Sequence, residues 1–137
     1  MSNETWGYQP RKNRPAPDWD VNPQTDAVRA GLARSGFGET SEALYLNSGF
    51  TYSSSQEALD SFGDETDHFL YSRFHNPTVG MFEKRLAAIE GAEYCVATGS
   101  GMSAMFASVA CLVAAGDHIV ASAAMFSSCH VVLTEIL

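Results

Sequence analysis

The sequence is poor in basic residues. Eight Lys and Arg side chains stand against sixteen Asp and Glu side chains in 137 residues, a formal net charge of -8, and the only two lysines are Lys12 and Lys84. Binding to DNA or RNA needs clustered basic side chains that neutralise phosphates. We therefore expect no nucleic-acid partner and, for the same reason, no binding to an anionic membrane surface.

Cysteines and long apolar runs are also scarce. Cys95, Cys111 and Cys129 show no Cys-x-x-Cys spacing, and the four histidines show no paired spacing, so neither a disulfide framework nor a metal site is predicted. No segment approaches the roughly 20 apolar residues of a membrane span, and the N-terminus has no signal-peptide pattern. These features predict a cytoplasmic protein without a metal.

The first half of the chain carries weak structural signals. Residues 1 to about 24 hold four of the five prolines and both tryptophans and predict an extended arm. A short helix is expected with Thr25 as its N-cap and Ser35-Gly36 at its end. Residues 43–52 suit a strand or another extended segment. The acidic stretch 57–67 is expected to be a solvated loop or helix face.

The second half alternates helix and strand signals. Asn76-Pro77 starts an amphipathic helix that Gly91 ends, and further segments predict a strand, a helix, a strand and the start of another helix: 94–98, 102–115, 118–121 and 131–137. This order predicts an α/β fold with a parallel sheet. We divide the chain into residues 1–75, an arm and inter-subunit segment, and residues 76–137, the start of a larger domain. The wholly apolar helix and the pattern broken at Leu137 predict an N-terminal portion of a longer protein.

One candidate site is the loop Gly99-Ser100-Gly101, which connects a predicted strand to a predicted helix. The free N–H groups and the macrodipole of a helix N-terminus attract anions, and glycine allows close approach. The loop lacks the Gly-Lys-Ser/Thr of a P-loop, and Ala104 replaces the third glycine of Gly-x-Gly-x-x-Gly, so a nicotinamide fold stays open. A purely conformational turn stays open as well.

Three other side chains are candidates. Tyr71 and Arg73, two residues apart on a predicted extended segment, can hold a phosphate through a phenol and a guanidinium fork. Phe126 follows the second predicted strand, where a ring can stack on a flat cofactor, although a core position is the alternative. Lys84 is expected to be a solvated charge.

Four blocks together resemble the Cys/Met-metabolism family of pyridoxal-phosphate (PLP) enzymes. They are Tyr71 to Thr78, Glu83 to Glu93, Ala97 to Ala104 and Ala115 to His118. The earlier stretches Thr25 to Arg34 and Ser41 to Phe50 most resemble the O-succinylhomoserine sulfhydrylase branch.

The resemblance implies a fold-type I, aspartate aminotransferase-like large domain and a homotetramer of catalytic dimers. It implies that the amides of Gly101 and Met102 hold the PLP phosphate, that Tyr71 and Arg73 reach the same phosphate across the dimer, and that Phe126 stacks on the pyridine. The family usually has Tyr-Gly-Gly-Thr where this chain has Phe126-Ser127-Ser128-Cys129.

The resemblance also implies an activity: homocysteine formation from O-succinylhomoserine and sulfide, in methionine biosynthesis. The family's Schiff-base lysine falls beyond Leu137, so no catalytic residue lies in this chain, and the chain alone is expected to be inactive. Cystathionine γ-synthase, a γ-lyase and a non-catalytic nucleotide-binding module are the alternatives.

Overall fold

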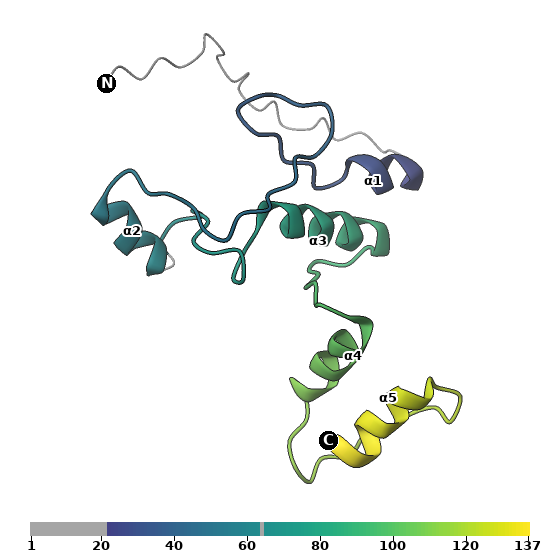
Figure 1. Cartoon of the computed structure of the whole chain (residues 1–137). Helices are drawn as coiled ribbons and strands as arrows, with labels where there is room; N and C mark the ends of the chain where they lie inside the picture. Colours follow the sequence, from purple (N-terminus) through teal and green to yellow (C-terminus); the bar gives the residue numbers. More distant parts are fainter. Residues whose placement is uncertain (1–21, 64) are drawn as a thin grey trace, which may run out of the picture. The chain divides into compact units, whose positions relative to one another are not determined.

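The computed structural model describes residues 22–63 and 65–137, and the chain divides into two compact units, residues 1–95 and residues 96–137 (Figure 1). Nearly all of the predicted N-terminal arm lies outside the described residues. Within those residues, helices α1 to α5 and one π-helical turn, η1, are joined by irregular segments.

Helix α1 (Pro23–Arg29) begins earlier than the sequence predicted. Asn22 is its N-cap, because the Asn22 side chain accepts a hydrogen bond of 2.9 Å from the N–H of Gln24. The predicted N-cap, Thr25, and the predicted end at Ser35-Gly36 are wrong. Asn22 and Pro23 form a stronger N-cap and first-turn pair, and the helix already ends at Ala30.

Helix α3 (Pro77–Glu90) confirms the prediction for this segment. The Asn76 side chain accepts a hydrogen bond from the N–H of Thr78 at 2.9 Å, and Gly91 ends the helix with a left-handed φ of 64°. Met81 and Ala87 of α3 are buried, and α1 packs against α3. This pair forms the main contact between helices in the described part of the first unit.

Just after helix α1, the backbone at Gly31 lies very close to helix α3. A Cβ at Gly31 would lie 2.6 Å from the Cβ of Lys84 and 3.0 Å from the carbonyl oxygen of Met81. The backbone φ of Gly31 is also positive, at 69°. Both facts require glycine at this position.

Helix α2 (Ser55–Phe62) contains the first part of the acidic stretch. Ser54 caps it, with its hydroxyl accepting from the N–H of Glu57 at 3.1 Å. Glu65 and Asp67, after the helix, are exposed as predicted, whereas Glu57 is only half-exposed. The solvated interpretation is therefore confirmed for Glu65 and Asp67, whereas Glu57 and Asp60 are partly covered.

Residues 43–52 form an extended segment rather than a full strand. One antiparallel bridge joins Gly49 to Tyr71, flanked by hydrogen bonds from the Phe50 N–H to the Leu70 carbonyl (3.3 Å) and from the Ser72 N–H to the Ser48 carbonyl (2.9 Å). These contacts place residues 48–50 beside residues 70–72.

The second unit contains α4 (Gly101–Ala110), α5 (Ser127–Val131) and η1 (Val132–Ile136), and α4 contacts α5. The predicted helix over 102–115 therefore ends five residues early. The Asp117 carboxylate accepts a hydrogen bond from the Ala114 N–H (2.8 Å), and the Asp117 N–H donates to the Ala114 carbonyl (3.0 Å), so this segment forms a turn.

The segments predicted as strands, 94–98 and 118–121, make no ladder with any described residue. Val96 is 80% exposed and Val120 fully exposed. An extended segment becomes a strand only by pairing its backbone with a neighbour, and the described residues offer none here. The parallel sheet thus stays a prediction.

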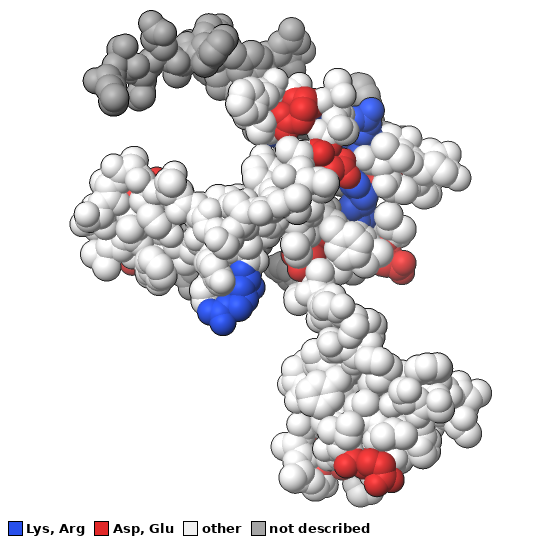
Figure 2. All heavy atoms as spheres, viewed as in Figure 1, with Lys and Arg blue, Asp and Glu red and all other residues white. Residues whose placement is uncertain are grey.

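Charge is unevenly divided between the units. Asp117 and Glu135 are the only charged residues among 96–137, and the surface of α4 and α5 shown in Figure 2 is almost entirely uncharged. The basic residues of the described chain all belong to the first unit. In the part of the chain that the structure describes, no helix has the length and apolar character to cross a membrane.

Candidate functional site

The candidate residues Tyr71 and Arg73 lie on a tight turn. The carbonyl of Tyr71 accepts hydrogen bonds from the N–H groups of Phe74 (2.9 Å) and His75 (3.1 Å). The extended backbone predicted for this segment is therefore wrong beyond Tyr71. The turn still brings the two candidate side chains together, because the Arg73 guanidinium carbon lies 5.6 Å from the centre of the Tyr71 ring.

The ring of Phe74 supports the same guanidinium. Its centre lies 5.0 Å from the guanidinium carbon of Arg73, within the range of a cation–π contact, and the Tyr71 and Phe74 rings meet edge to face at 6.2 Å. Tyr71, Arg73 and Phe74 are all exposed. A guanidinium that lies against two ring faces keeps its N–H donors available for an anion.

A group of polar residues, which we call the Asn76 cluster, holds this turn: Asn76, Ser72, Tyr45, Asn47 and Thr78. Asn76 is only 6% exposed, and its amide nitrogen donates to the Tyr45 carbonyl (3.0 Å) and to the Ser72 hydroxyl (2.9 Å). The Ser72 hydroxyl donates onward to the Asn47 carbonyl at 2.5 Å. The Tyr45 N–H donates to the Thr78 hydroxyl at 2.9 Å. The backbone of residues 45–47 is therefore hydrogen-bonded by side chains of Ser72, Asn76 and Thr78.

Aromatic stacking joins the same segments on another side. The ring of Phe69 lies 5.3 Å from Phe50 and 5.2 Å from His75, measured between ring centres, and Tyr52 lies 5.0 Å from His68. These contacts fasten residues 50–52 to the residues that flank the turn. The backbone that carries Arg73 is therefore held by packing as well as by hydrogen bonds.

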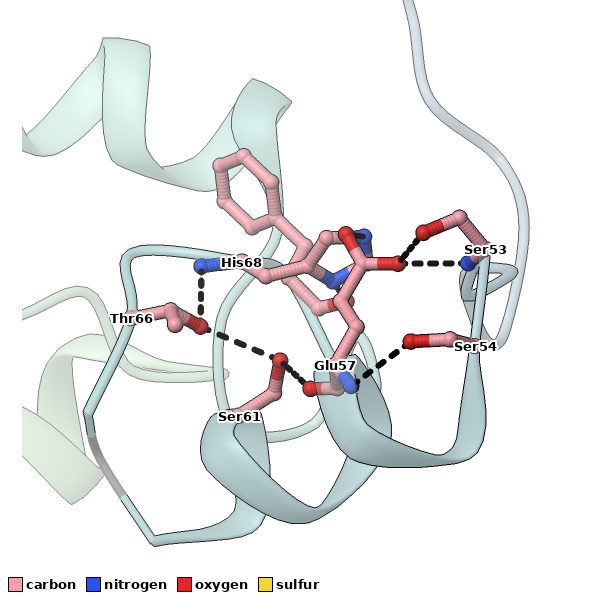
Figure 3. Close-up of polar contacts among 7 residues, drawn as sticks. Ser53, Ser54, Glu57, Ser61, Thr66 and His68 are labelled. Atoms are coloured by element: carbon pink, nitrogen blue, oxygen red, sulfur yellow. Dashed lines mark hydrogen bonds and ion pairs between the residues drawn. The ribbon is translucent and has the colours of Figure 1, made fainter.

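Glu57 is the centre of a further polar group, shown in Figure 3. Both the hydroxyl and the N–H of Ser53 donate to one Glu57 carboxylate oxygen at 2.5 Å, and Nε2 of His68 lies 3.9 Å from the other. The Ser53 hydroxyl, followed by the Ser53 N–H, lowers the pKa of Glu57. This carboxylate therefore stays ionised and fixes the start of α2.

The loop after α2 is fastened to the same helix. The Ser61 hydroxyl donates to the Glu57 carbonyl at 2.6 Å and lies 3.1 Å from the Thr66 hydroxyl, which accepts from the His68 N–H at 3.4 Å (Figure 3). Sequence reasoning gave His68 no role and Glu57 a solvated one. The Ser53-Ser54-x-x-Glu57 spacing, a capping pattern, was the signal available for Glu57.

Arg85 is another residue that the sequence did not single out. Its Nε donates to the Ala30 carbonyl (3.1 Å), and one terminal nitrogen donates to Oε1 of Glu42 (2.7 Å). The guanidinium lowers the pKa of Glu42 through this hydrogen bond, and the Glu42 carboxylate raises the pKa of Arg85. This pair links α3 to the segments on either side of residues 31–41. Lys84 beside it is exposed, as predicted.

The second unit contains the candidate loop Gly99-Ser100-Gly101. Ser100 caps α4: its hydroxyl accepts from the Ser103 N–H (3.2 Å) and its carbonyl from the Ala104 N–H (3.0 Å). The N–H groups of Gly101 and Met102 come before these and have no acceptor within the described part of the chain. A helix start with two available N–H donors is the geometry that the sequence predicted for an anion site.

Phe126 lies at the N-terminal boundary of α5 and is 67% exposed. Other apolar side chains of this unit, such as Leu112 and Val120, are at least as exposed, so the stacking and core interpretations of Phe126 both stay predictions. Across the described ranges, no group of three or more His, Cys, Asp or Glu residues is arranged to hold a metal ion.

Comparisons with known proteins cover most of the chain. A family model described as Cys/Met metabolism PLP-dependent enzyme matches residues 24–137. An O-succinylhomoserine sulfhydrylase of Mycobacterium tuberculosis (strain ATCC 25618 / H37Rv) is 53% identical over 117 residues, which cover 85% of this chain and 29% of that protein. An O-succinylhomoserine sulfhydrylase of Pseudomonas aeruginosa is 47% identical over 104 residues, covering 76% of this chain and 26% of that protein.

Two further relatives are more distant. An L-methionine gamma-lyase of Porphyromonas gingivalis is 31% identical over 111 residues, covering 81% of this chain and 28% of that protein. A crystal structure of a putative O-acetylhomoserine (thiol)-lyase from Campylobacter jejuni, containing N'-pyridoxyl-lysine-5'-monophosphate, aligns with a TM-score of 0.78 at 24% identity, covering 85% of this chain and 29% of that one.

The chain thus spans less than a third of the length of these relatives. The structural likeness shows that it shares the fold of the matching part of the lyase, and the family match extends through both units. This chain belongs to the Cys/Met metabolism family of PLP-dependent enzymes.

Proposed function

We propose that the chain is the N-terminal portion of a PLP-dependent O-succinylhomoserine sulfhydrylase, which forms homocysteine from O-succinylhomoserine and sulfide. The observation that carries the proposal is the difference in identity between branches of the family: 53% and 47% to two sulfhydrylases, against 31% to an L-methionine gamma-lyase. In this proposal, the homocysteine formed is used in methionine biosynthesis.

The donor groups in the structure suit the phosphate of PLP. Among the described residues, the N–H groups of Gly101 and Met102 at the start of α4 have no acceptor, and nothing beyond the chain neighbours and the helix's own backbone lies within 4 Å of the position a Cβ of Gly101 would take. The guanidinium of Arg73 and the phenol of Tyr71 lie together on an exposed turn. Each set offers hydrogen-bond donors to an anion, in one case with a full positive charge.

In the proposed site these residues bind and orient the cofactor. The amides of Gly101 and Met102 hold the phosphate, Arg73 and Tyr71 contribute donors to the phosphate in the partner subunit, and Phe126 lies against the pyridine ring. When bound, PLP supplies an electron sink that eases the removal of protons near the substrate amino group. In the overall exchange the Cγ–O bond to succinate breaks, a Cγ–S bond to hydrosulfide forms, and succinate leaves as its carboxylate.

The proposal includes an assembly and a location. We infer a homotetramer of catalytic dimers, with residues 1–75 as an arm and inter-subunit segment and residues 76–137 as the start of the PLP-binding domain. The three separate cysteines, all free, support a reducing cytoplasm. The lysine that would bind PLP covalently lies beyond Leu137 in this proposal, so the 137-residue chain alone is expected to be inactive.

Substrate assays with the full-length protein test the activity. We expect homocysteine and succinate from O-succinylhomoserine and sulfide. Cystathionine formed preferentially from cysteine would favour a cystathionine γ-synthase, and elimination without sulfide would favour a γ-lyase. A native gene product with the mass of the 137-residue chain and no bound PLP would favour a non-catalytic nucleotide-binding module.

A further inference from the structure

The Asn76 cluster is more elaborate than a helix cap requires. Capping α3 uses only Oδ1 of Asn76, which accepts from the Thr78 N–H at 2.9 Å. Ser or Asp would serve equally well as a cap. The amide nitrogen of Asn76 makes two more hydrogen bonds, to the Tyr45 carbonyl and the Ser72 hydroxyl, and these do nothing for the cap itself.

One of these hydrogen bonds acts directly on Ser72, the residue next to Arg73, and the other holds Tyr45 in the segment whose Asn47 carbonyl accepts from the Ser72 hydroxyl. Ser72 is held at two points: its N–H donates to the Ser48 carbonyl (2.9 Å), and its hydroxyl accepts from Asn76 while donating to the Asn47 carbonyl (2.5 Å). The backbone of Arg73 is therefore held on both sides: Ser72 before it is hydrogen-bonded, and Phe74 and His75 after it donate to the Tyr71 carbonyl. The remaining freedom of its guanidinium is limited by the rings of Tyr71 and Phe74.

We infer that Asn76, acting through Ser72, is a positioning residue that aims the Arg73 guanidinium at the phosphate of PLP. The inference rests on the proposed contact between Arg73 and that phosphate. A flexible arginine loses side-chain entropy when it binds an anion, so a turn that is already fixed makes the contact stronger. Because Asn76 is buried, we assign it a positioning role and no direct contact with the cofactor.

The test uses Asn76→Ser in the full-length protein, because serine keeps the cap of α3 and removes the two amide donations. The matched control is Asn22→Ser, the same change at the N-cap of α1, where the side chain accepts from the Gln24 N–H. Ser72→Ala is a second, milder variant that removes the same link if Asn76→Ser does not fold. Each apoenzyme is titrated with PLP and with pyridoxal, which lacks the phosphate.

We expect Asn76→Ser and Ser72→Ala to weaken PLP binding by about tenfold, as for the loss of one or two hydrogen bonds. Pyridoxal binding should be unchanged, and Asn22→Ser should change neither. In an Arg73→Ala background the effect of Asn76→Ser on PLP affinity should vanish, which a merely structural role would not produce.

Two results would overturn the inference while leaving the phosphate contact intact. One is an equal loss of PLP and pyridoxal affinity, and the other is an undiminished effect of Asn76→Ser without Arg73. If Arg73→Ala itself left PLP affinity unchanged, the proposed contact of Arg73 would fail, and the positioning role would fail with it.

Discussion

The side-chain hydrogen bonds inside the first unit differ from those inside the second unit. In the first unit, side-chain hydrogen bonds join residues far apart in the sequence, such as Arg85 to Ala30, Arg85 to Glu42 and Asn76 to Tyr45. Between Thr98 and Leu137, the side-chain hydrogen bonds join residues two to four positions apart.

This difference shows how each unit presents its candidate residues. The first unit positions Arg73 through tertiary contacts, so distant substitutions should affect it. The second unit presents Gly101, Met102 and Phe126 at the starts of α4 and α5, where the side-chain hydrogen bonds are local, with exposed apolar side chains around them. Large apolar surfaces are usually covered by other parts of a protein.

The largest expected effect tests the packing of the first unit at Gly31. We expect Gly31→Ala to lower the free energy of unfolding by about 2–4 kcal/mol, because it combines a left-handed backbone with a clash against Lys84 and Met81 of α3. Denaturant unfolding of the full-length protein measures it.

Gly91→Ala is the matched control, since Gly91 has the same backbone conformation with no atom within 4 Å of a Cβ. It should cost only about 1 kcal/mol. Equal losses for both variants would mean that the close approach of α1 and α3 contributes nothing.

Arg73→Ala tests the candidate residue that the first unit positions. We expect the affinity for PLP to fall by about 1.5–3 kcal/mol, because a charge-assisted hydrogen bond to the phosphate is lost. Titration of the apoenzyme measures it, with the stability of the apoenzyme as the control.

Hybrid oligomers then test whether Arg73 acts across the dimer. Mixing Arg73→Ala subunits with subunits that lack the cofactor-binding lysine should restore part of the activity, because each hybrid dimer contains one intact site. Hybrids as inactive as their parents would show that Arg73 serves its own subunit.

Phe126 tests the second unit, where the ring is exposed rather than packed. We expect Phe126→Ala to weaken PLP binding by roughly 1 kcal/mol through loss of the aromatic contact, with little change in apoenzyme stability. Phe126→Tyr should keep the affinity. A loss of about 3–5 kcal/mol in apoenzyme stability, with unchanged PLP affinity, would instead identify Phe126 as a core residue of the intact protein.

The smallest effect concerns the pH dependence of the link between Glu42 and Arg85. The Arg85 hydrogen bond lowers the pKa of Glu42 in the folded protein. The ionised carboxylate therefore stabilises the fold above the pKa it has in the unfolded chain. This contribution is lost as the pH falls from about 4 through the lower pKa of the folded state.

In Glu42→Gln, the free energy of unfolding should fall less steeply as the pH is lowered from 6. Glu65→Gln, which removes an exposed carboxylate away from Arg85, is the matched control. If the free energy of unfolding fell equally steeply at low pH in the wild type and in Glu42→Gln, the hydrogen bond would contribute nothing to folding.

The sequence predicted helices best where capping residues lie next to the helix itself. Asn76-Pro77 and Gly91 mark the two ends of α3, and the interactions that make them signals reach only a few residues. The start of α1 was misplaced because Thr25 and the pair Asn22-Pro23 both suit a helix start. The end of α4 was placed too late because Gly116-Asp117 was the stop signal in the sequence, whereas Asp117 forms a separate turn with Ala114 after the helix has ended at Ala110.

The sequence by itself indicated the family, a helix start directly after the Gly99-Ser100-Gly101 loop and the residues Tyr71 and Arg73 as candidates, because these depend on motifs and local spacing. Only the tertiary structure revealed that Arg73 lies against the rings of Tyr71 and Phe74 and that Asn76 and Ser72 hold its turn. The link between Arg85 and Glu42 also required the structure. The links from Ser72, Asn76 and Arg85 to the segments before them join residues 25 to 55 positions apart, and such hydrogen bonds leave no local pattern in the sequence. The ring contacts of Arg73 depend on the turn at Tyr71, where the sequence predicted an extended backbone.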